Sequence, residues 1–336
     1  MQSTVEDNWQ QQPADEQLAE VARRLPPIFS TFGFELRLDG HQTRVDLGVG
    51  VERAASSYLR DWAIENADED PQNVASWGGL SRLAAVWAET ESILARVPFI
   101  FLEFDCAGEE RAGAPSIFVA VDHREADFAT GAVLTTPVLE CVFRKRRLSA
   151  VKKDVQRALS LLPNDSRILH LGIMLSRPSC PVRLSVSLPR HGLREYLHAI
   201  DSSGAAASAL QTISLFESTA ALAGLPESAQ VDFDVSPARG AFGLTLRPLS
   251  PGHWPSLVAQ LREQGLCDRN HSEMLLGWTG MQRERMGPFG VPVDLSRYVS
   301  HVKVVCDKAG VTAKAYIGAT PTLGLLRESV PDIPRQ

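Results

Sequence analysis

The sequence is poor in cysteine and has no long hydrophobic run. Its five cysteines are an odd number among 336 residues and form no C-x-x-C pair, so neither a disulfide framework nor a cysteine-based zinc site is expected. No apolar stretch approaches the roughly 18 to 20 residues that a transmembrane helix requires. The polar, acidic segment Met1–Gln12 is unlike a signal peptide. These absences predict a cytoplasmic protein with reduced thiols and no membrane partner.

An excess of basic charge is also missing. Lysine and arginine number 34 against 40 aspartates and glutamates, a net charge of −6, whereas a nucleic-acid-binding protein usually carries a basic face. The basic run Arg144–Arg147 has no interleaved aromatic residue and is predicted to be a solvated helix face. The sequence has no P-loop and no serine nucleophile elbow. Nucleic acid is therefore not expected as a partner.

What the sequence does have is five pairs of short runs in which apolar and polar residues alternate, each pair broken by a turn sequence. The pairs are Phe32–Leu38 with Arg44–Val51, Phe99–Asp105 with Ser116–Asp122, Ile168–Ser176 with Val182–Leu188, Val231–Ser236 with Phe242–Arg247, and Val299–Asp307 with Val311–Gly318. Period-two alternation bounded by Gly, Pro, Asp and Ser predicts five β-hairpins.

Helical patterns lie between the hairpins. They cover Asp15–Leu25, Val51–Ala67, Trp77–Val97, Pro137–Leu162 (as one helix or two), Arg190–Ile200, Ala206–Ala223, Trp254–Gln264 and His271–Arg285. The order is close to five helix–strand–strand–helix units. We expect one domain over residues 14–320, preceded by a disordered tail (1–13) and followed by a C-terminal tail (321–336).

The ten antiparallel strands are predicted to close into a barrel, because closure removes the two exposed sheet edges. One face of each hairpin is apolar and needs a layer of helices over it, whereas the other face is polar and points into the barrel. The predicted fold class is α+β, a ten-stranded antiparallel β-barrel of five αββα units ringed by α-helices. The alternative is an open sheet with its polar face in solvent. A ten-stranded barrel leaves an internal chamber, since eight strands are already filled by their own side chains.

The residues that face this chamber form the candidate site. The alternation assigns to it Glu35, Arg37, Arg44, Asp46 and Gly48 of the first hairpin, Phe99, Phe101, Glu103, Asp105, Phe118 and Ala120 of the second, His170, Met174, Ser176, Arg183, Ser185 and Ser187 of the third, Asp232, Asp234, Ser236, Thr245 and Arg247 of the fourth, and His301, Lys303, Lys314 and Tyr316 of the fifth. Buried charges are costly unless they are paired or used, which speaks against a carrier that only binds an apolar ligand.

Five αββα units that form such a barrel resemble the ABBA-type prenyltransferases, the PT-barrel superfamily. The resemblance is one of architecture and covers residues 15–320. Its most suggestive local piece is the last hairpin, where Ser-His-Val-Lys-Val-Val (300–305) and Ala-Lys-Ala-Tyr-Ile-Gly (313–318) are similar to family strands that place a Lys and then a Lys-x-Tyr into the lumen.

The resemblance implies an enzyme of secondary metabolism that transfers a prenyl group from an allylic diphosphate to an aromatic or peptide acceptor. The diphosphate is a co-substrate, and no resident cofactor is implied. Several cations must bind its oxygens by charge-assisted hydrogen bonds. The implied cations are Arg37, Arg183, Arg247, Lys303 and Lys314, with Arg44 as an addition.

The same resemblance implies roles for aromatic and acidic residues. Phe99, Phe101 and Phe118 are implied to stabilise the carbocation by cation–π attraction. Either Glu103 or Asp105 is implied to orient the acceptor and accept its proton, and burial among phenylalanines should raise the pKa of such a carboxyl. His301 and Tyr316 complete the implied catalytic set.

The sequence departs from the family pattern in two ways. It has only four tyrosines, of which only Tyr316 is clearly predicted to face inward, whereas the family often shields the cation with tyrosines. Its chamber is also rich in carboxylates, which repel a diphosphate unless they pair with cations or bind a divalent ion. No Asp-Asp-x-x-Asp motif is present, so magnesium has no support in the sequence and no metal ligand is predicted.

These departures keep a second function open. It is a lyase or cyclase of the same fold that uses acid–base chemistry on a peptide or natural-product scaffold through Glu103, His301, Lys303 and Tyr316, because a fold alone does not decide function. Under either function we expect a small-molecule or peptide substrate, and a monomer or a homodimer.

Overall fold

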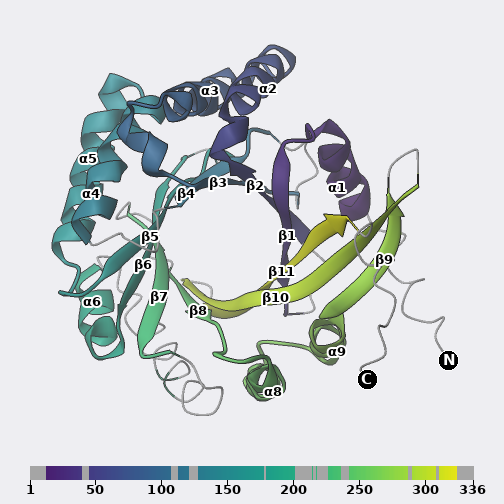
Figure 1. The fold of residues 1–336 in the computed structure, drawn as a ribbon. Coiled ribbons are helices and arrows are strands. Elements are labelled where there is room, and N and C mark those ends of the chain that lie inside the picture. Colours follow the sequence, from purple (N-terminus) through teal and green to yellow (C-terminus); the bar gives the residue numbers. More distant parts are fainter. Residues whose placement is uncertain are drawn as a thin grey trace, which may run out of the picture.

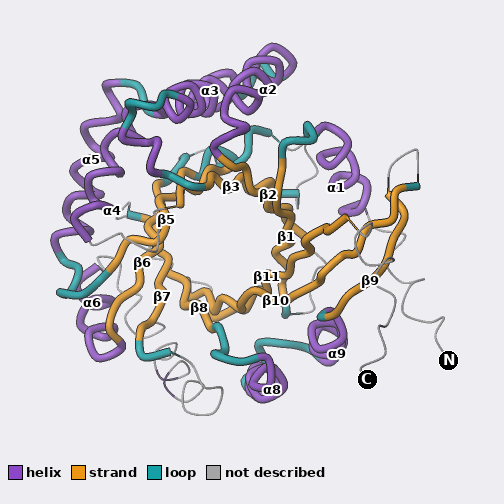
Figure 2. Tube along the Cα trace, in the orientation of Figure 1, coloured by secondary structure: helices purple, strands orange, loops and turns teal. Residues whose placement is uncertain are grey.

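The sheet of this protein closes on itself. The structure, a computed structural model, describes residues 13–39, 45–106, 113–120, 128–177, 179–200, 214, 217, 226–235, 242–286, 290–307 and 310–323. Ten strands pair antiparallel in the order β1-β2-β3-β4-β5-β6-β7-β8-β10-β11, and β11 pairs back with β1. Figures 1 and 2 show this ring of strands end-on. The predicted closed barrel is confirmed, and the open sheet is excluded.

The barrel strands follow the predicted hairpins closely. Their bounds are β1 (Phe29–Arg37), β2 (Val45–Glu52), β3 (Phe99–Phe104), β4 (Ser116–Ala120), β5 (Arg167–Ile173), β6 (Val182–Pro189), β7 (Ser228–Asp234), β8 (Phe242–Leu246), β10 (Val291–Asp307) and β11 (Gly310–Leu323). β11 extends to Leu323, three residues beyond the predicted domain end, and the rest of the predicted C-terminal tail lies outside the described residues.

Helices cover the outside of the ring (Figure 1). The described α-helices are α1 (Pro13–Arg24), α2 (Ser56–Glu69), α3 (Val74–Ala88), α4 (Phe128–Val142), α5 (Lys145–Ser160), α6 (Leu193–Ile200), α8 (Trp254–Glu263) and α9 (Arg269–Trp278), and short 3-10 turns cover Arg53–Ala55, Ile93–Arg96, Arg190–Gly192 and Pro251–His253. The segment predicted as one helix or two, Pro137–Leu162, belongs to two helices, α4 and α5. The helix predicted over Ala206–Ala223 lies outside the described residues except at 214 and 217. None of the helices described is long and apolar enough to span a membrane.

The hydrophobic core lies between the barrel and these helices. Outward-facing Leu36, Leu47, Leu102 and Leu244 are each at most 3% exposed and belong to one continuous cluster that includes Trp77 of α3. Burial of each such leucine contributes roughly 1.5–3 kcal/mol. The apolar outer face predicted from the alternation is therefore confirmed, and the alternate, polar positions of the strands are left facing the lumen.

The prediction is wrong between residues 271 and 298, where the structure departs from it most. The helix predicted over His271–Arg285 ends at Trp278, because Thr279 is extended with a ψ of 141° and Gly280 adopts a φ of +144°, neither of which continues a helix. Residues Gly280–Met286 instead form β9, which pairs with the first half of β10 outside the closed ring. β9 was missed because its sequence, GMQRERM, lacks the apolar alternation of a half-buried strand.

Candidate active site

Strand register brings several predicted site residues together on β1, β10 and β11. Tyr316 of β11 lies opposite His301 of β10 on one side and opposite Glu35 of β1 on the other. Two residues along, Lys314 lies opposite Lys303. Residues that are nearly 300 positions apart in the chain thus become neighbours on one wall of the lumen.

Glu35 is the acceptor at the centre of this wall. Lys314 Nζ donates a hydrogen bond to one of its carboxylate oxygens, and the Tyr316 hydroxyl donates one to the other. Burial alone would raise the pKa of Glu35, but the charges of Lys314 and Lys303 and the two hydrogen bonds hold it at about 2. Burial and the Glu35 charge in turn raise the pKa of Tyr316 well above its ordinary value. The carboxylate is therefore ionised at neutral pH, and the phenol keeps its proton.

His301 and Lys303 both contact the Tyr316 ring. The His301 ring stacks on it with 4.2 Å between centroids and 13° between planes, and Lys303 Nζ lies 4.8 Å from its centroid. Burial and the nearby Lys303 charge lower the pKa of His301 to about 3. His301 is thus a neutral imidazole at pH 7 and a weak proton acceptor.

Two further cations of the lumen are held by carboxylates. Lys303 Nζ lies 3.1 Å from Asp232 Oδ2, and Arg183 Nε donates to Asp234 Oδ1 at 2.9 Å. Burial would raise the pKa of Asp232, but the charges of Lys303 and Arg183 outweigh it, and the pKa is lowered. With the pair of Lys314 and Glu35, three of the five cations implied for a diphosphate each contact a carboxylate.

Glu103 is different from these paired acids. It lies on β3 opposite Gly48 of β2 and Ser116 of β4. In the described part of the chain, no hydrogen bond or ion pair reaches its carboxyl group. Burial, followed by the negative charges of Glu35 and Asp105, raises the pKa of Glu103 to about 7. Such a carboxyl gains and loses a proton near neutral pH, as a general base must.

Asp46 on β2 shares part of this environment. It lies opposite Glu35, and its Oδ1 accepts the backbone N–H of Cys106 at 3.0 Å. Burial and the charges of Glu35 and Asp105 raise the pKa of Asp46 to about 6. The carboxyls of Glu103 and Asp46 therefore have elevated pKa values, while those of Glu35 and Asp232 have lowered ones.

Asp105, the second predicted base, belongs to a polar network at the end of β3. Its Oδ2 accepts a hydrogen bond from the Ser176 hydroxyl at 2.5 Å, and Ser176 lies 2.8 Å from the Ser116 hydroxyl. Arg177 Nε is 4.0 Å from the same oxygen. These contacts hold Asp105 in place, so that of the two predicted bases only Glu103 has a carboxyl that no described residue engages.

The phenylalanines predicted for the lumen lie on β3, which also carries Glu103, and on the neighbouring strand β4. Phe101 stacks with Phe99 at 6.3 Å and meets His170 edge-on at 6.1 Å between ring centroids. Phe118 lies opposite Phe101 on β4 and covers Gly172 of β5, where a Cβ atom would be only 2.8 Å from the Phe118 ring. The wall formed by β3, β4 and β5 is thus aromatic.

The remaining predicted cations lie near the edges of this arrangement. Arg37 is half-buried and lies opposite Lys314. Arg247 follows the end of β8 and is exposed, although it is close enough for its charge to lower the pKa of His301. Arg44 and Ser236 lie outside the described residues.

Sequence reasoning missed one aromatic residue of the lumen, Tyr298. The register of β10 against β11 shifts between Val299 and His301, so that Ser300 is an extra residue, a β-bulge. The bulge turns Tyr298 to the same sheet face as Gly318 and Tyr316. The sequence does contain a signal for this bulge. The outward-facing Val299 and Val302 are three residues apart, whereas residues on one face of a regular strand are two apart.

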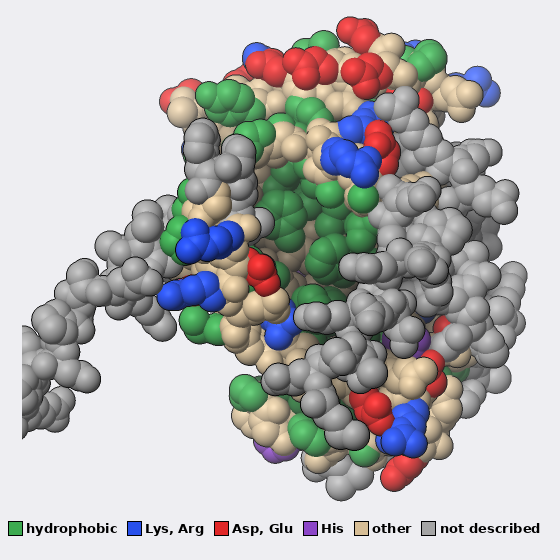
Figure 3. Space-filling view, turned by 90° about the vertical axis from the view of Figure 1, so that its right-hand side faces the viewer, with side chains coloured by type: hydrophobic (Ala, Val, Ile, Leu, Met, Phe, Trp, Pro, Cys, Tyr) green, Lys and Arg blue, Asp and Glu red, His purple; other side chains and the backbone are tan. Residues whose placement is uncertain are grey.

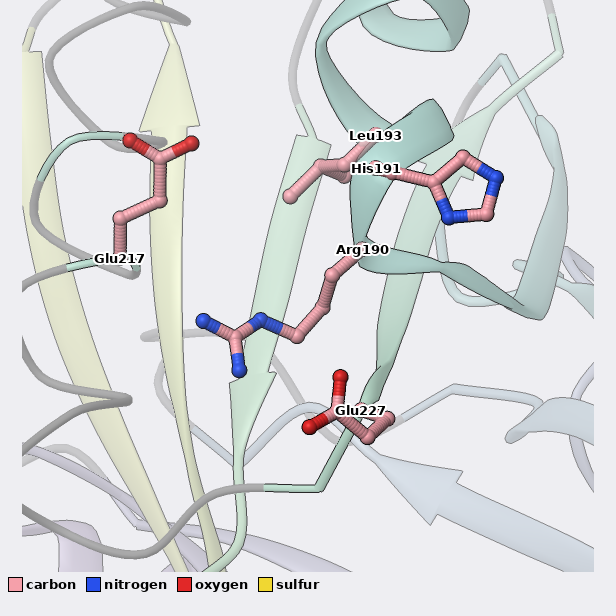
Figure 4. A pocket seen from close by; sticks show the side chains of 5 residues that line it. All are labelled: Arg190, His191, Leu193, Glu217 and Glu227. Carbon is pink, nitrogen blue, oxygen red and sulfur yellow. The ribbon is translucent and has the colours of Figure 1, made fainter.

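Hollows lie on the described surface away from the strand contacts above. Figure 3 shows, on the right-hand face of Figure 1, a recess whose bottom is lined by hydrophobic side chains. A separate pocket of about 380 Å³ is lined by Arg190, His191, Leu193, Glu217 and Glu227 (Figure 4). None of the predicted site residues lines this second pocket.

No protein-family model and no curated protein matches the sequence. Among solved structures, 5-dimethylallyltryptophan synthase from Streptomyces coelicolor is 14% identical over 91% of each chain, with a TM-score of 0.47. The 5-dimethylallyl tryptophan synthase of that organism in complex with DMASPP and Trp is 11% identical over 97% of this chain and 94% of its own, again with a TM-score of 0.47. AnaPT from Neosartorya fischeri is 10% identical over 88% of this chain and 78% of its own, with a TM-score of 0.50. The likeness to AnaPT and the closed ring of strands confirm the predicted PT-barrel fold. At these sequence identities the comparisons show the fold alone.

Proposed function

We propose that the protein is an enzyme whose active site is the barrel lumen and that it transfers a prenyl group from an allylic diphosphate to an electron-rich acceptor. The observation that carries the proposal is the division of the lumen wall. Three cations, Arg183, Lys303 and Lys314, lie on β6, β10 and β11, and the proton-accepting carboxyl of Glu103 lies on β3, the strand that also carries Phe99 and Phe101.

The cations serve the donor. In the proposed reaction the bond between the prenyl carbon and the diphosphate oxygen breaks, and the electron pair leaves with the diphosphate. Lysine and arginine stabilise that developing charge by charge-assisted hydrogen bonds. The Tyr316 phenol, which keeps its proton, is a further donor. Because Glu35 occupies both Lys314 and Tyr316, a bound diphosphate must take over these hydrogen bonds from Glu35.

The aromatic wall and Glu103 serve the acceptor. Phe101 and Phe118 stabilise the allylic cation by cation–π attraction. The acceptor donates an electron pair to the cation, a new bond to carbon forms, and the acceptor then loses a proton to the Glu103 carboxylate. A pKa of about 7 lets Glu103 accept this proton and release it to solvent at neutral pH. His301, held neutral, acts as a positioning residue for the Tyr316 ring.

One observation favours the second function, acid–base catalysis without a prenyl donor. Each of the cations Arg183, Lys303 and Lys314 already contacts a carboxylate, so no anion is needed to neutralise it. In a lyase or cyclase, Glu103 would remove a proton from the substrate, and Lys303 or Tyr316 would donate one.

Donor binding separates the two functions. Dimethylallyl and geranyl thiodiphosphate are titrated calorimetrically into the wild type, Lys303→Ala and Lys314→Ala, with and without magnesium. Lys153→Ala, an exposed lysine of α5, is the matched control. Prenyl transfer predicts micromolar binding that weakens at least about tenfold in the two lumen variants and is unchanged in the control, since each variant removes a charge-assisted hydrogen bond. Absence of binding to the wild type under both conditions contradicts prenyl transfer and leaves acid–base catalysis.

A further inference from the structure

The bulge at Ser300 places an aromatic ring where the alternation does not predict one. Tyr298 lies opposite Gly318 of β11, and the ring lies directly over that glycine. A Cβ atom built on Gly318 would be 2.5 Å from Tyr298 Cζ and 2.6 Å from the hydroxyl oxygen. Only glycine leaves room for the ring at this distance. The Tyr298 ring therefore lies against the lumen wall at β11.

The wall next to this ring is bare backbone. Gly318 lies opposite Gly33 of β1, and Gly33 lies opposite Gly48 of β2. Among the described residues, the Cβ positions of Gly33 and Gly48 approach only backbone carbonyl oxygens, at 3.2 and 3.7 Å. No described side chain comes within 4 Å of these two positions. The lumen wall here is thus a floor two strands wide that carries no side chain of its own.

The two sides of this floor differ in chemistry. On one side is the Tyr298 ring, and on the other is Glu103, which lies opposite Gly48 and has no hydrogen-bond partner among the described residues. From β11 to β3 the wall spans three interstrand distances, about 14 Å, and the Tyr298 ring lies over its β11 end. The open part is roughly 10 Å wide, which accommodates a planar system of up to about two fused rings beside the carboxyl.

We propose that Tyr298 is a specificity-determining residue, which limits the acceptor on the floor of Gly33 and Gly48 to planar ring systems of about this width. This proposal rests on the proposed function, because it assumes that the acceptor binds next to Glu103, the proposed base. It concerns the acceptor alone, and its test needs no diphosphate. Failure of donor binding and failure of this proposal are therefore distinguishable.

The test compares two aromatic probes of different width. 2-Naphthol has two fused rings and 9-phenanthrol has three, and each is titrated calorimetrically into the protein without a donor. We expect the wild type to bind 2-naphthol at least about tenfold more tightly than 9-phenanthrol, and Tyr298→Ala to remove most of that preference, because steric exclusion of even small groups reaches this size. Tyr298→Phe should keep the preference, since the ring and not the hydroxyl closes the floor.

Two further variants distinguish the proposed effect from a general loss of structure. Tyr58→Ala, at a tyrosine of α2 that is 65% exposed, should leave both affinities unchanged. Gly48→Ala adds a methyl group to the floor where the nearest described atom is 3.7 Å away, so it should fold normally. It should nevertheless weaken 2-naphthol binding about tenfold. An unchanged preference in Tyr298→Ala, or a wild type that binds neither probe, overturns the proposal.

Discussion

Two glutamates on the wall of one lumen behave in opposite ways. Glu35 and Glu103 are close enough for the charge of one to raise the pKa of the other, yet the pKa of Glu35 is about 2 and that of Glu103 about 7. The difference comes from partners and not from burial. Glu35 accepts hydrogen bonds from Lys314 and Tyr316, whereas no described residue donates to Glu103. The comparison teaches that a carboxyl with counter-charges stays ionised and holds those charges in place until a ligand replaces it. A carboxyl without counter-charges is available for proton transfer.

The largest expected effect is on catalysis. Glu103→Gln keeps the shape of the side chain but removes its basicity, so turnover should fall about 10² to 10⁴-fold. Turnover is followed as diphosphate released from dimethylallyl diphosphate in the presence of an acceptor. Thiodiphosphate affinity should stay within about twofold, because no described lysine or arginine forms a hydrogen bond or ion pair with Glu103. Full turnover in this variant would show that Glu103 is not the base.

Removal of the counter-charge from Glu35 should convert it into a destabilising group. Lys314→Ala leaves a buried carboxylate without its cation and should cost roughly 3 kcal/mol of unfolding free energy at pH 7, measured in urea. The double variant Glu35→Gln/Lys314→Ala should recover a large part of this loss. Lys152→Ala, which breaks the surface pair with Glu140, is the control and should cost at most about 1 kcal/mol. Equal losses in the two single variants would contradict the comparison.

The pH dependence of stability should expose Glu103 directly. Its pKa is about 7 in the folded protein and has its ordinary value of 4.5 in the unfolded chain, so the folded state binds more protons between these values. Stability is therefore lost as pH rises from 4.5 to 7. Glu103→Gln should be about 2–3 kcal/mol more stable relative to the wild type at pH 8 than at pH 4, measured by urea unfolding at both pH values. The same difference at both pH values would refute the raised pKa.

The smallest effect is expected at Asp105. Its charge raises the pKa of Glu103, but its carboxylate is engaged by Ser176. Asp105→Asn should therefore move the acidic limb of the pH–turnover profile to lower pH and change maximal turnover by less than about tenfold. A loss as large as that of Glu103→Gln would assign the catalytic role to Asp105 instead.

The sequence predicts the barrel well and its contacts poorly. The alternation in β1 and β2 places Leu36 and Leu47 outward and Glu35 inward because strands have a period of two, which is local information. The partner of Glu35 is Lys314, 279 residues away, and such a pair depends on how β11 registers against β1. Register is set by the assembled sheet and by the bulge at Ser300, so the pairing of cations with carboxylates could not be derived residue by residue.

The closing strand also sets the order in which the molecule can mature. β1 pairs with β11, and Glu35 receives its two donors from residues 279 and 281 positions further along the chain. At a synthesis rate of roughly 5–20 residues per second, β1 waits on the order of 15–60 s for its second neighbour. During that interval its edge is unpaired and Glu35 has no counter-charge. Any sheet that forms in this interval is open at β1 and exposes that edge to aggregation, and the lumen acquires its charge balance only when the last strand is inserted.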